Sequence, residues 1–342
     1  MQRPDRLDVY YGSELVGTIH DASPVAFEYA ASWLDRAERM TVAAIALQPG
    51  RNDSAAVQAF FENLLPEGEL RHYLAEQRKS STLFSLLLEV AGDTAGGFVI
   101  VPGGGSIPSR PPTRRPPGRP WPPRSTHILK PNIKRLAWAW HSAANETIVM
   151  RTAANCGLPT AEVFYEPHTE SCVVRRFDRL VRPDGTLARL VQYDLCQLAG
   201  TVSERKYEKE GGPGLAACAE LIQNLSIYNL PGKGVTLTPF HDLMCTRLYP
   251  GMSQDFAFAI GGEYEPAAMT SAHLAPLAQQ LGMRPRFLAR QAADLARRMP
   301  DAMEQAVEDV KPALPHAART LAERLQRFVQ STTMKLAARL AQ

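Results

Sequence analysis

The chain has 342 residues, which is long enough for two domains that each bury a core. Its 45% hydrophobic and 21% charged residues are typical of a globular protein, and a net charge of +3 argues against a dedicated nucleic-acid-binding protein. The five cysteines form no CxxC pair, so we expect reduced thiols in the cytoplasm and no zinc site. We expect no signal peptide and no membrane helix, because no apolar run approaches roughly 18 residues.

The first hundred residues predict a domain of mixed strands and helices. Apolar residues alternate over residues 7–19 around a Gly12-Ser13 turn, which predicts a β-hairpin. Residues 54–65 place their apolar side chains on one helical face, which predicts an amphipathic helix. Two further helices over residues 67–77 and 81–90 and a buried strand over residues 98–101 complete this part.

A proline- and arginine-rich segment follows, over residues 102–124. It holds nine prolines, five arginines and four glycines, and it has no acidic residue. Such a composition cannot bury a core, so it favours an extended or disordered linker. Residues 108–112 and 116–120 also resemble short proline-rich ligands, but such pieces are common by chance.

The remaining chain predicts strands first and helices later. Residues 126–130 form a strand that ends in Lys130, and residues 144–156 form a helix that stops at Gly157. Next we expect a hairpin over residues 162–177, a turn at residues 183–185, a helix over residues 192–198, a loop over residues 206–214, and three amphipathic helices from His273 onward. The last helix carries one acidic and five basic residues; a solvated basic face is the simplest interpretation, and contact with DNA or a partner is the alternative.

Lys130 is the first candidate for chemistry. A lysine at a strand end and Glu146 on the next helix match the Lys–Glu pair that orients nucleotide phosphates in kinases. From spacing alone, a surface lysine and an unrelated helix glutamate fit better. Arg175, Arg176 and Phe177 follow an apolar strand, where a kinase would hold adenine; a strand-end cluster of salt bridges fits that pattern equally well.

Asn224 and Asp242 are the candidate metal ligands. Residues 225–228 and 235–238 predict a hairpin around a glycine-rich turn, which would bring the two side chains together. Carboxamide and carboxylate oxygens both suit Mg²⁺. The alternative, a capping Asn and an Asp at a turn, is equally compatible with the pattern. His241 beside Asp242 fits a site-lining or packing residue better than a general base.

Together these segments resemble the HipA family, the serine/threonine-kinase toxins of bacterial type II toxin–antitoxin systems. The resemblance covers most of the chain, and so many signatures in order are jointly specific. They are residues 60–66, residues 92–97, residues 125–131, Asn145-Glu146, residues 176–179 (with Arg175 where a glutamate is usual), residues 206–214, residues 238–243 and residues 258–262.

Two departures from the family pattern affect activity. The proline–arginine segment stands where family members carry a glycine-containing phosphate loop with a regulatory serine. The family motif D-x-H-x-K-N ends at the position of Asn224, but residues 217–222 join Asn224 directly, so the catalytic Asp is absent and no catalytic residue is identified. Whether another acid such as Glu220 replaces it stays open. General base catalysis contributes roughly 10²–10⁴-fold.

The resemblance implies an α+β, protein-kinase-like fold of two lobes with a small N-terminal subdomain and a helical C-terminal lobe. The implied limits are residues 1–101 for the HipA N-terminal subdomain, 102–124 for the linker, and 125–342 for the kinase domain. Within the kinase domain, residues 125–200 form the nucleotide-binding lobe and residues 201–342 form the helical lobe.

The implied activity is ATP-dependent phosphorylation of a protein serine or threonine, which we expect to be weak or lost here. Lys130, paired with Glu146, would hold phosphates, and Phe177 with its neighbours Arg175 and Arg176 would hold the adenine. His241 would line the cofactor site, and Asn224 and Asp242 would bind the Mg²⁺. The implied partner is a helix-turn-helix antitoxin of the HipB type, with DNA contacted through it; an aminoacyl-tRNA synthetase is the kind of substrate expected of an active member. The alternative is a non-catalytic pseudokinase that only binds the antitoxin.

Overall fold

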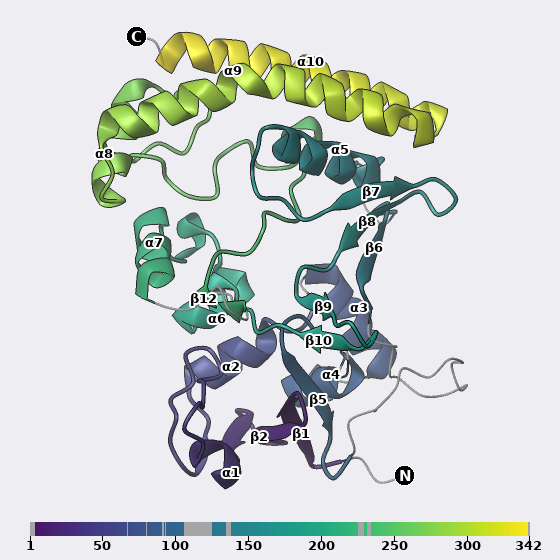
Figure 1. Cartoon of the computed structure of the whole chain (residues 1–342), viewed down its shortest axis with the longest axis vertical. Helices are drawn as coiled ribbons and strands as arrows, with labels where there is room; N and C mark the ends of the chain where they lie inside the picture. The colour runs from purple at the N-terminus through teal and green to yellow at the C-terminus, as the bar shows by residue number, and fades with distance from the viewer. Residues whose placement is uncertain are drawn as a thin grey trace. The chain divides into compact units, whose positions relative to one another are not determined.

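The computed structural model describes residues 4–66, 68–79, 81–90, 92, 94–105, 125–134, 138–224, 229–230 and 234–340. It divides into two compact units, whose elements are labelled in Figure 1. Unit 1 comprises Met1–Ser125, Asp178–Pro213 and Ala217–Thr238, and unit 2 comprises Thr126–Phe177, Gly214–Ala216 and Pro239–Gln342. The predicted domain limits follow the order of the sequence, whereas each of these units is assembled from separate segments. Most of the predicted linker, residues 106–124, lies outside the described residues.

Unit 1 is built on a five-stranded antiparallel sheet in the order β4-β3-β2-β1-β5. The predicted hairpin over residues 7–19 is confirmed, because Leu7 of β1 pairs with Ile19 of β2. Both side chains are fully buried, as the alternating pattern requires. The strands are β1 (Arg6–Tyr11), β2 (Glu14–His20), β3 (Ala26–Tyr29), β4 (Arg51–Asn52) and β5 (Phe98–Pro102).

Helices cover the buried side of this sheet and enclose an aromatic core. Phe60 and Phe61 of α2 contact Phe98, Phe27 and Tyr193 with ring centroids 5.6–6.2 Å apart. Aromatic side chains supply large buried areas, so this cluster dominates the unit's hydrophobic stabilisation. The helices are α1 (Ala31–Leu34), α2 (Ala55–Glu62), α3 (Gly68–Arg78), α4 (Leu83–Val90) and α6 (Leu195–Ala199), of which α2, α3, α4 and, with a later start, α6 were predicted.

A buried ion pair holds the turn that precedes β5. The side chains of Asp178 and Arg179 are 5% and 1% exposed, and Arg179 Nη1 lies 2.6 Å from Asp178 Oδ2. Asp178 accepts a hydrogen bond from the Gly96 amide at 2.9 Å, and Arg179 donates to the Gly96 and Thr94 carbonyls at 3.2 and 3.0 Å. From strand β10 (Leu187–Arg189), Arg189 donates to the Gly92 carbonyl at 2.6 Å. Asp178 and Arg179, the last two residues of the signature at residues 176–179, therefore join residues of the signature at residues 92–97 in one network within unit 1.

Unit 2 contains a three-stranded antiparallel sheet in the order β6-β8-β7. The strands are β6 (His127–Pro131), β7 (Val163–Glu166) and β8 (Ser171–Arg175), so the predicted strand and hairpin are confirmed. Lys130 of β6 lies opposite Cys172 of β8, which in turn lies opposite Tyr165 of β7. Helix α5 (Ser142–Asn155) packs against this sheet and buries Ile148 and Met150 completely.

Three helices complete unit 2, as predicted: α8 (Ser271–Gln280), α9 (Pro285–Val310) and α10 (His316–Leu340). Figure 1 shows α9 and α10 as two long helices that lie side by side, and α9 also packs on α5. The predicted apolar stripe of the last helix faces this packing, since Leu321 and Leu325 are fully buried with Met303 and Val307 of α9. Pro285 opens α9 at a position where its missing N–H costs nothing.

The structure departs from the prediction at two elements. The predicted helix over residues 192–198 begins only at Leu195, because Asp194 caps it and accepts a hydrogen bond from the Gln197 amide. The predicted hairpin after Asn224 is displaced: α7 (Leu215–Asn224) ends at Asn224, and β11 (Asn229–Leu230) pairs with β12 (Gly234–Val235). Residues 225–228 and 231–233 lie outside the described residues.

The other described elements are short: β9 (Arg179–Val181), β10 (Leu187–Arg189), η1 (Ser203–Arg205), η2 (Glu208–Glu210), η3 (Thr246–Leu248) and η4 (Lys311–Ala313). The turn predicted at residues 183–185 joins β9 to β10, with the Gly185 amide donating to the Arg182 carbonyl. A search of the described helices finds none with the length and apolar character that crossing a membrane requires.

The Asp178–Arg179 pair yields a first testable prediction. Replacing Arg179 with Met removes a buried charge from beside the Asp178 carboxylate and the hydrogen bonds to the Gly96 and Thr94 carbonyls, so the free energy of unfolding should fall by on the order of 3–5 kcal/mol. Urea denaturation followed by circular dichroism measures this loss. Arg175→Met is the matched control, because Arg175 pairs with Glu162 in solvent and should change stability by about 0–1 kcal/mol. Equal losses in the two variants would contradict the structural role of the buried pair.

Candidate functional site

Lys130 lies at the centre of the candidate site. Its ammonium nitrogen is 2.7 Å from Glu146 Oε1, so the end of β6 is joined to the first turns of α5. The Lys130 side chain is 28% exposed and that of Glu146 only 12%, which shields this pair from solvent screening. The structure thus brings together the two residues that spacing alone left as unrelated.

Asp242 contacts the same ammonium group through Oδ1. The segment before it is fixed by backbone hydrogen bonds: the Phe240 amide donates to the Pro159 carbonyl at 2.8 Å, and the Ala161 amide donates to the Phe240 carbonyl at 2.9 Å. Asp242 then adopts a left-handed backbone conformation with φ of +57°. Its side chain is 64% exposed, so the carboxylate reaches Lys130 and still faces solvent.

The electrostatics of this group keep Lys130 charged. Burial lowers the pKa of the Lys130 ammonium, but attraction to Asp242 and Glu146 outweighs burial and raises the pKa above its ordinary value. Burial raises the pKa of the Glu146 carboxyl, and the attraction of Lys130 offsets part of that rise. Lys130 therefore favours the ionised form of Glu146 in its buried position.

Asn145 organises the segment that follows Asp242, a role that sequence reasoning missed. This fully buried side chain accepts a hydrogen bond from the Cys245 amide at 2.9 Å and donates to the Cys245 carbonyl at 3.0 Å. It also donates to the Tyr249 hydroxyl at 3.0 Å. The neighbouring residues Asn145 and Glu146 thus hold both the segment after Asp242 and the Lys130 ammonium. The sequence signal for this role of Asn145 was its position, as a polar residue next to Glu146 near the start of a helix.

The other predicted residues are less closely grouped. The Phe177 and His241 rings lie 5.0 Å apart, and His241 Nδ1 donates to the Pro239 carbonyl at 3.0 Å. Arg175 instead points into solvent, 3.0 Å from Glu162. The Arg176 side chain is buried, and its backbone amide donates to the Thr126 carbonyl.

Asn224 is the residue predicted to bind a metal together with Asp242. Asn224 belongs to unit 1 and ends α7, and its side chain lies outside the described part of the chain. A grouping of three or more His, Cys, Asp or Glu side chains that could hold a metal does not occur among the described residues. The pairing of Asn224 with Asp242 therefore stays a prediction.

The dependence of Glu146 on Lys130 can be tested by pH. Lys130→Met should lower the free energy of unfolding by about 1–3 kcal/mol near neutral pH, because it leaves a buried carboxylate unpaired. The folded-state pKa of Glu146 then rises further above the unfolded value of about 4.3. A carboxyl with a raised folded pKa stabilises the protein below that pKa, so the deficit should shrink as the pH falls from about 8 towards 5.

Thermal denaturation across this pH range measures the deficit. Asp242→Asn is the control with the smaller effect, because Lys130 keeps Glu146 as its partner. The double variant Lys130→Met/Glu146→Gln should show no such pH dependence. A pH-independent deficit for Lys130→Met would show that its cost arises from packing and not from an unpaired Glu146.

Comparison with known proteins assigns a family to this geometry. A family model described as the HipA N-terminal domain matches residues 7–101, and one described as the HipA-like C-terminal domain matches residues 118–229. The putative kinase Y4mE of Sinorhizobium fredii is 27% identical and covers 92% of this chain and 94% of its own length. The serine/threonine-protein kinase toxin HipA of Shewanella oneidensis is 25% identical, and the match covers 82% of this chain and 86% of the length of that protein.

The alignments also show that this chain is shorter within the shared region. The Y4mE alignment spans 403 positions and the HipA alignment spans 378, although the whole chain has only 342 residues. Both alignments must therefore contain positions that have no residue in this chain.

A solved structure with the same fold is the complex of HipA, HipB and operator DNA from Shewanella oneidensis MR-1. It matches with a TM-score of 0.72 and 24% identity, and the match covers 97% of this chain and 96% of that one. The α+β fold class is thereby confirmed, and the two family models account between them for most of the residues up to 229. The chain belongs to the HipA family of serine/threonine-protein kinase toxins.

Proposed function

We propose that this protein is a HipA-like member of a toxin–antitoxin module that binds Mg-ATP and has weak or no kinase activity. The observation that carries the proposal is the Lys130 ammonium held between Glu146 and Asp242. In kinases a lysine paired with a helix glutamate binds the nucleotide phosphates, and a following Asp binds Mg²⁺. The same three residue types meet here at the end of a strand, on a helix and after a short extended segment.

The chemistry of these groups fits a magnesium-bound nucleotide. The Asp242 carboxylate is a hard oxygen ligand that faces solvent, and Lys130 stays protonated beside it, so a cation and a phosphate can each find an opposite charge. Asn224 would supply a second ligand for Mg²⁺. Phe177 and His241 would contact the adenine side, with Arg175 and Arg176 next to them. Bound ATP would supply the phosphoryl group.

The weak point for catalysis is proton removal from the substrate hydroxyl. Helix α7 ends at Asn224, and its one acidic residue, Glu220, lies four residues before Asn224, whereas the Asp of the family motif would lie five residues before it. A general base contributes roughly 10²–10⁴-fold to a reaction rate. Positions missing from this chain in both alignments support a real shortening. We therefore infer that this protein still binds nucleotide, whereas its phosphoryl transfer is weak or lost.

The expected partner is a small helix-turn-helix antitoxin of the HipB type, which would bring the protein to DNA. The support is the solved complex of a HipA with HipB and operator DNA, whose HipA chain shares this fold. An aminoacyl-tRNA synthetase is the substrate class we would test first if transfer occurs. The alternative is a pseudokinase that binds the antitoxin without nucleotide, and the shortened region favours it over a fully active toxin.

Nucleotide binding is the decisive measurement. We expect Mg-ATP to raise the melting temperature, because a ligand that binds only the folded state stabilises it. Asp242→Asn should abolish most of this rise by removing a Mg²⁺ ligand, whereas Asp184→Asn, which removes a carboxylate from an exposed turn of unit 1, should leave it unchanged. Absence of any rise in the unaltered protein would favour the alternative of a nucleotide-free binding module.

Phosphoryl transfer is measured separately with radiolabelled ATP and a generic protein substrate. We expect incorporation at the level of the Asp242→Asn control. Incorporation well above that control would overturn the proposed loss of activity. In that case Glu220→Gln tests whether this acid acts as the base: a loss of 10²-fold or more would support it.

A further inference from the structure

A cleft of about 640 Å³ lies in unit 2, between the segment after Asp242 and helix α10. It is lined on one side by residues 247–252 and on the other by Arg324, with Trp140 between them. This volume is in the range of pockets that hold small ligands or a few residues of a peptide. Lys130, Glu146 and Asp242 are not among its lining residues, so the cleft is distinct from the candidate nucleotide site.

Two arginines give this cleft its charge. The Arg324 guanidinium lies 4.8 Å from the centroid of the Trp140 ring, and that of Arg247 lies 5.4 Å from the centroid of the Phe328 ring. Arg247 also donates through Nε to Gln254 at 3.3 Å. In the described part of the chain, neither arginine lies within 4.0 Å of a carboxylate, and the residues that line the cleft include no acid. The cleft therefore carries two positive charges without an internal counter-charge.

Contact with an aromatic ring orients both arginine side chains so that they can bind an anion. Contact with an aromatic ring uses the flat face of a guanidinium and leaves the N–H groups at its edge available as donors. Arg324 and Phe328 lie one helical turn apart on α10, so the ring that Arg247 contacts is a neighbour of Arg324 on this helix. Two guanidinium groups suit a ligand with several acceptor oxygens and a double negative charge.

The floor of the cleft is rigid. Tyr249 is 1% exposed, and its hydroxyl donates to the Trp140 carbonyl at 3.2 Å and accepts from Asn145. The Trp140 and Tyr249 rings meet edge to face with centroids 5.9 Å apart. Trp140 is thus fixed by the same Asn145-centred hydrogen bonds that hold the segment after Asp242. A fixed Trp140 in turn fixes the position of the Arg324 guanidinium.

We propose that this cleft binds the phosphorylated serine or threonine side chain of a peptide. A phosphate monoester carries a charge of about −1.5 to −2 near neutral pH, which matches two arginines, whereas a carboxylate carries only one charge. Leu248, Pro250 and Met252 supply apolar lining for the residues that flank the phosphate. The cleft opens to solvent along the segment 247–254, as binding of a peptide requires.

The position of the cleft gives a second reason, which rests on the proposed function. In protein kinases the segment after the metal-binding Asp is ordered when a phosphate on that segment pairs with arginines. Here Arg247 belongs to the segment that follows Asp242, and Arg324 faces it from α10. A bound phosphopeptide would therefore stabilise the segment whose first residue is Asp242, so peptide and Mg-ATP should each strengthen the binding of the other.

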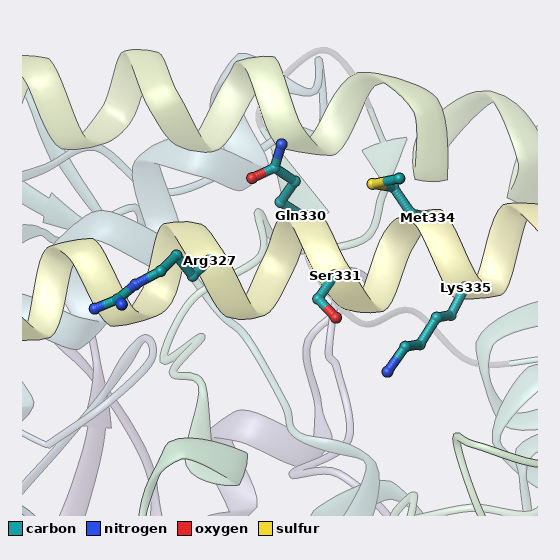
Figure 2. A pocket seen from close by; sticks show the side chains of 5 residues that line it. All are labelled: Arg327, Gln330, Ser331, Met334 and Lys335. Atoms are coloured by element: carbon teal, nitrogen blue, oxygen red, sulfur yellow. The ribbon is translucent and has the colours of Figure 1, made fainter.

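A second basic surface on α10 provides the matched control. A groove of about 330 Å³ lies on this helix. Figure 2 shows the side chains that line it, which are Arg327, Gln330, Ser331, Met334 and Lys335. The side chains of Arg327, Ser331 and Lys335 leave the helix on the same side in this view (Figure 2). Arg327 and Lys335 carry the same charge as Arg324 on the same helix, but no ring stacks on either of them among the described residues.

The test uses the full chain and a short fluorescein-labelled peptide with one phosphoserine between leucines. Fluorescence anisotropy without nucleotide should show saturable binding, and the same peptide with an unmodified serine should bind at least tenfold more weakly. Arg247→Gln and Arg324→Gln should each weaken binding by about tenfold or more, as expected for lost hydrogen bonds to a charged group. Arg327→Gln should change affinity by less than about twofold, since a rim charge acts mainly on the association rate.

Several results would overturn the proposal. Equal binding of the two peptides, or equal losses in Arg327→Gln and Arg324→Gln, would show non-specific attraction to a basic helix. Inorganic phosphate that displaces the labelled peptide as effectively as unlabelled phosphopeptide would identify a free-anion site. Displacement by Mg-ATP would place the peptide in the nucleotide site. Because the binding assay contains no nucleotide, a failure of Mg-ATP binding leaves it interpretable, and melting curves of each variant show whether the fold is retained.

Discussion

The ammonium group of Lys130 joins two carboxylates that come from distant parts of the chain, Glu146 and Asp242. Each contact depends on the other elements of unit 2: β6 positions the lysine, α5 positions the glutamate, and hydrogen bonds to Pro159 and Ala161 position the aspartate. Because the buried Glu146 carboxylate is paired with Lys130, the three elements cannot be rearranged independently. The site is therefore a property of the packing of unit 2.

Asn145 extends this constraint to the rest of the unit. Its amide binds the backbone of Cys245 and the hydroxyl of Tyr249, which in turn bonds to the Trp140 carbonyl. The arginine-lined cleft and the Lys130 site thus share a support, although they have no lining residue in common. Such a shared support is a physical means by which occupancy of one site can affect the other.

The local features of this protein could be predicted from its sequence. Alternation over residues 7–19 predicted the first hairpin, and apolar spacing predicted α9 and α10, because each signal depends on neighbours in the chain. Lys130 and Glu146 are close in sequence, and the family signatures identified them. In contrast, spacing could not predict that Asp178 binds the Gly96 amide 82 residues away, or that Arg324 stacks on Trp140. Such contacts depend on how elements pack, and pattern rules carry no information about packing.

The backbone at Asp242 limits which residues can replace it. A φ of +57° is costly for most side chains, costs least for glycine, and is tolerated by Asn and Asp. A chain that drifts under relaxed selection would therefore accept Asn or Gly here before Val or Thr. Both tolerated replacements preserve the turn and remove the negative charge. Loss of the carboxylate that contacts Lys130 should then precede loss of the local backbone shape, so a well-formed turn at this position is poor evidence that an acidic group is still present there.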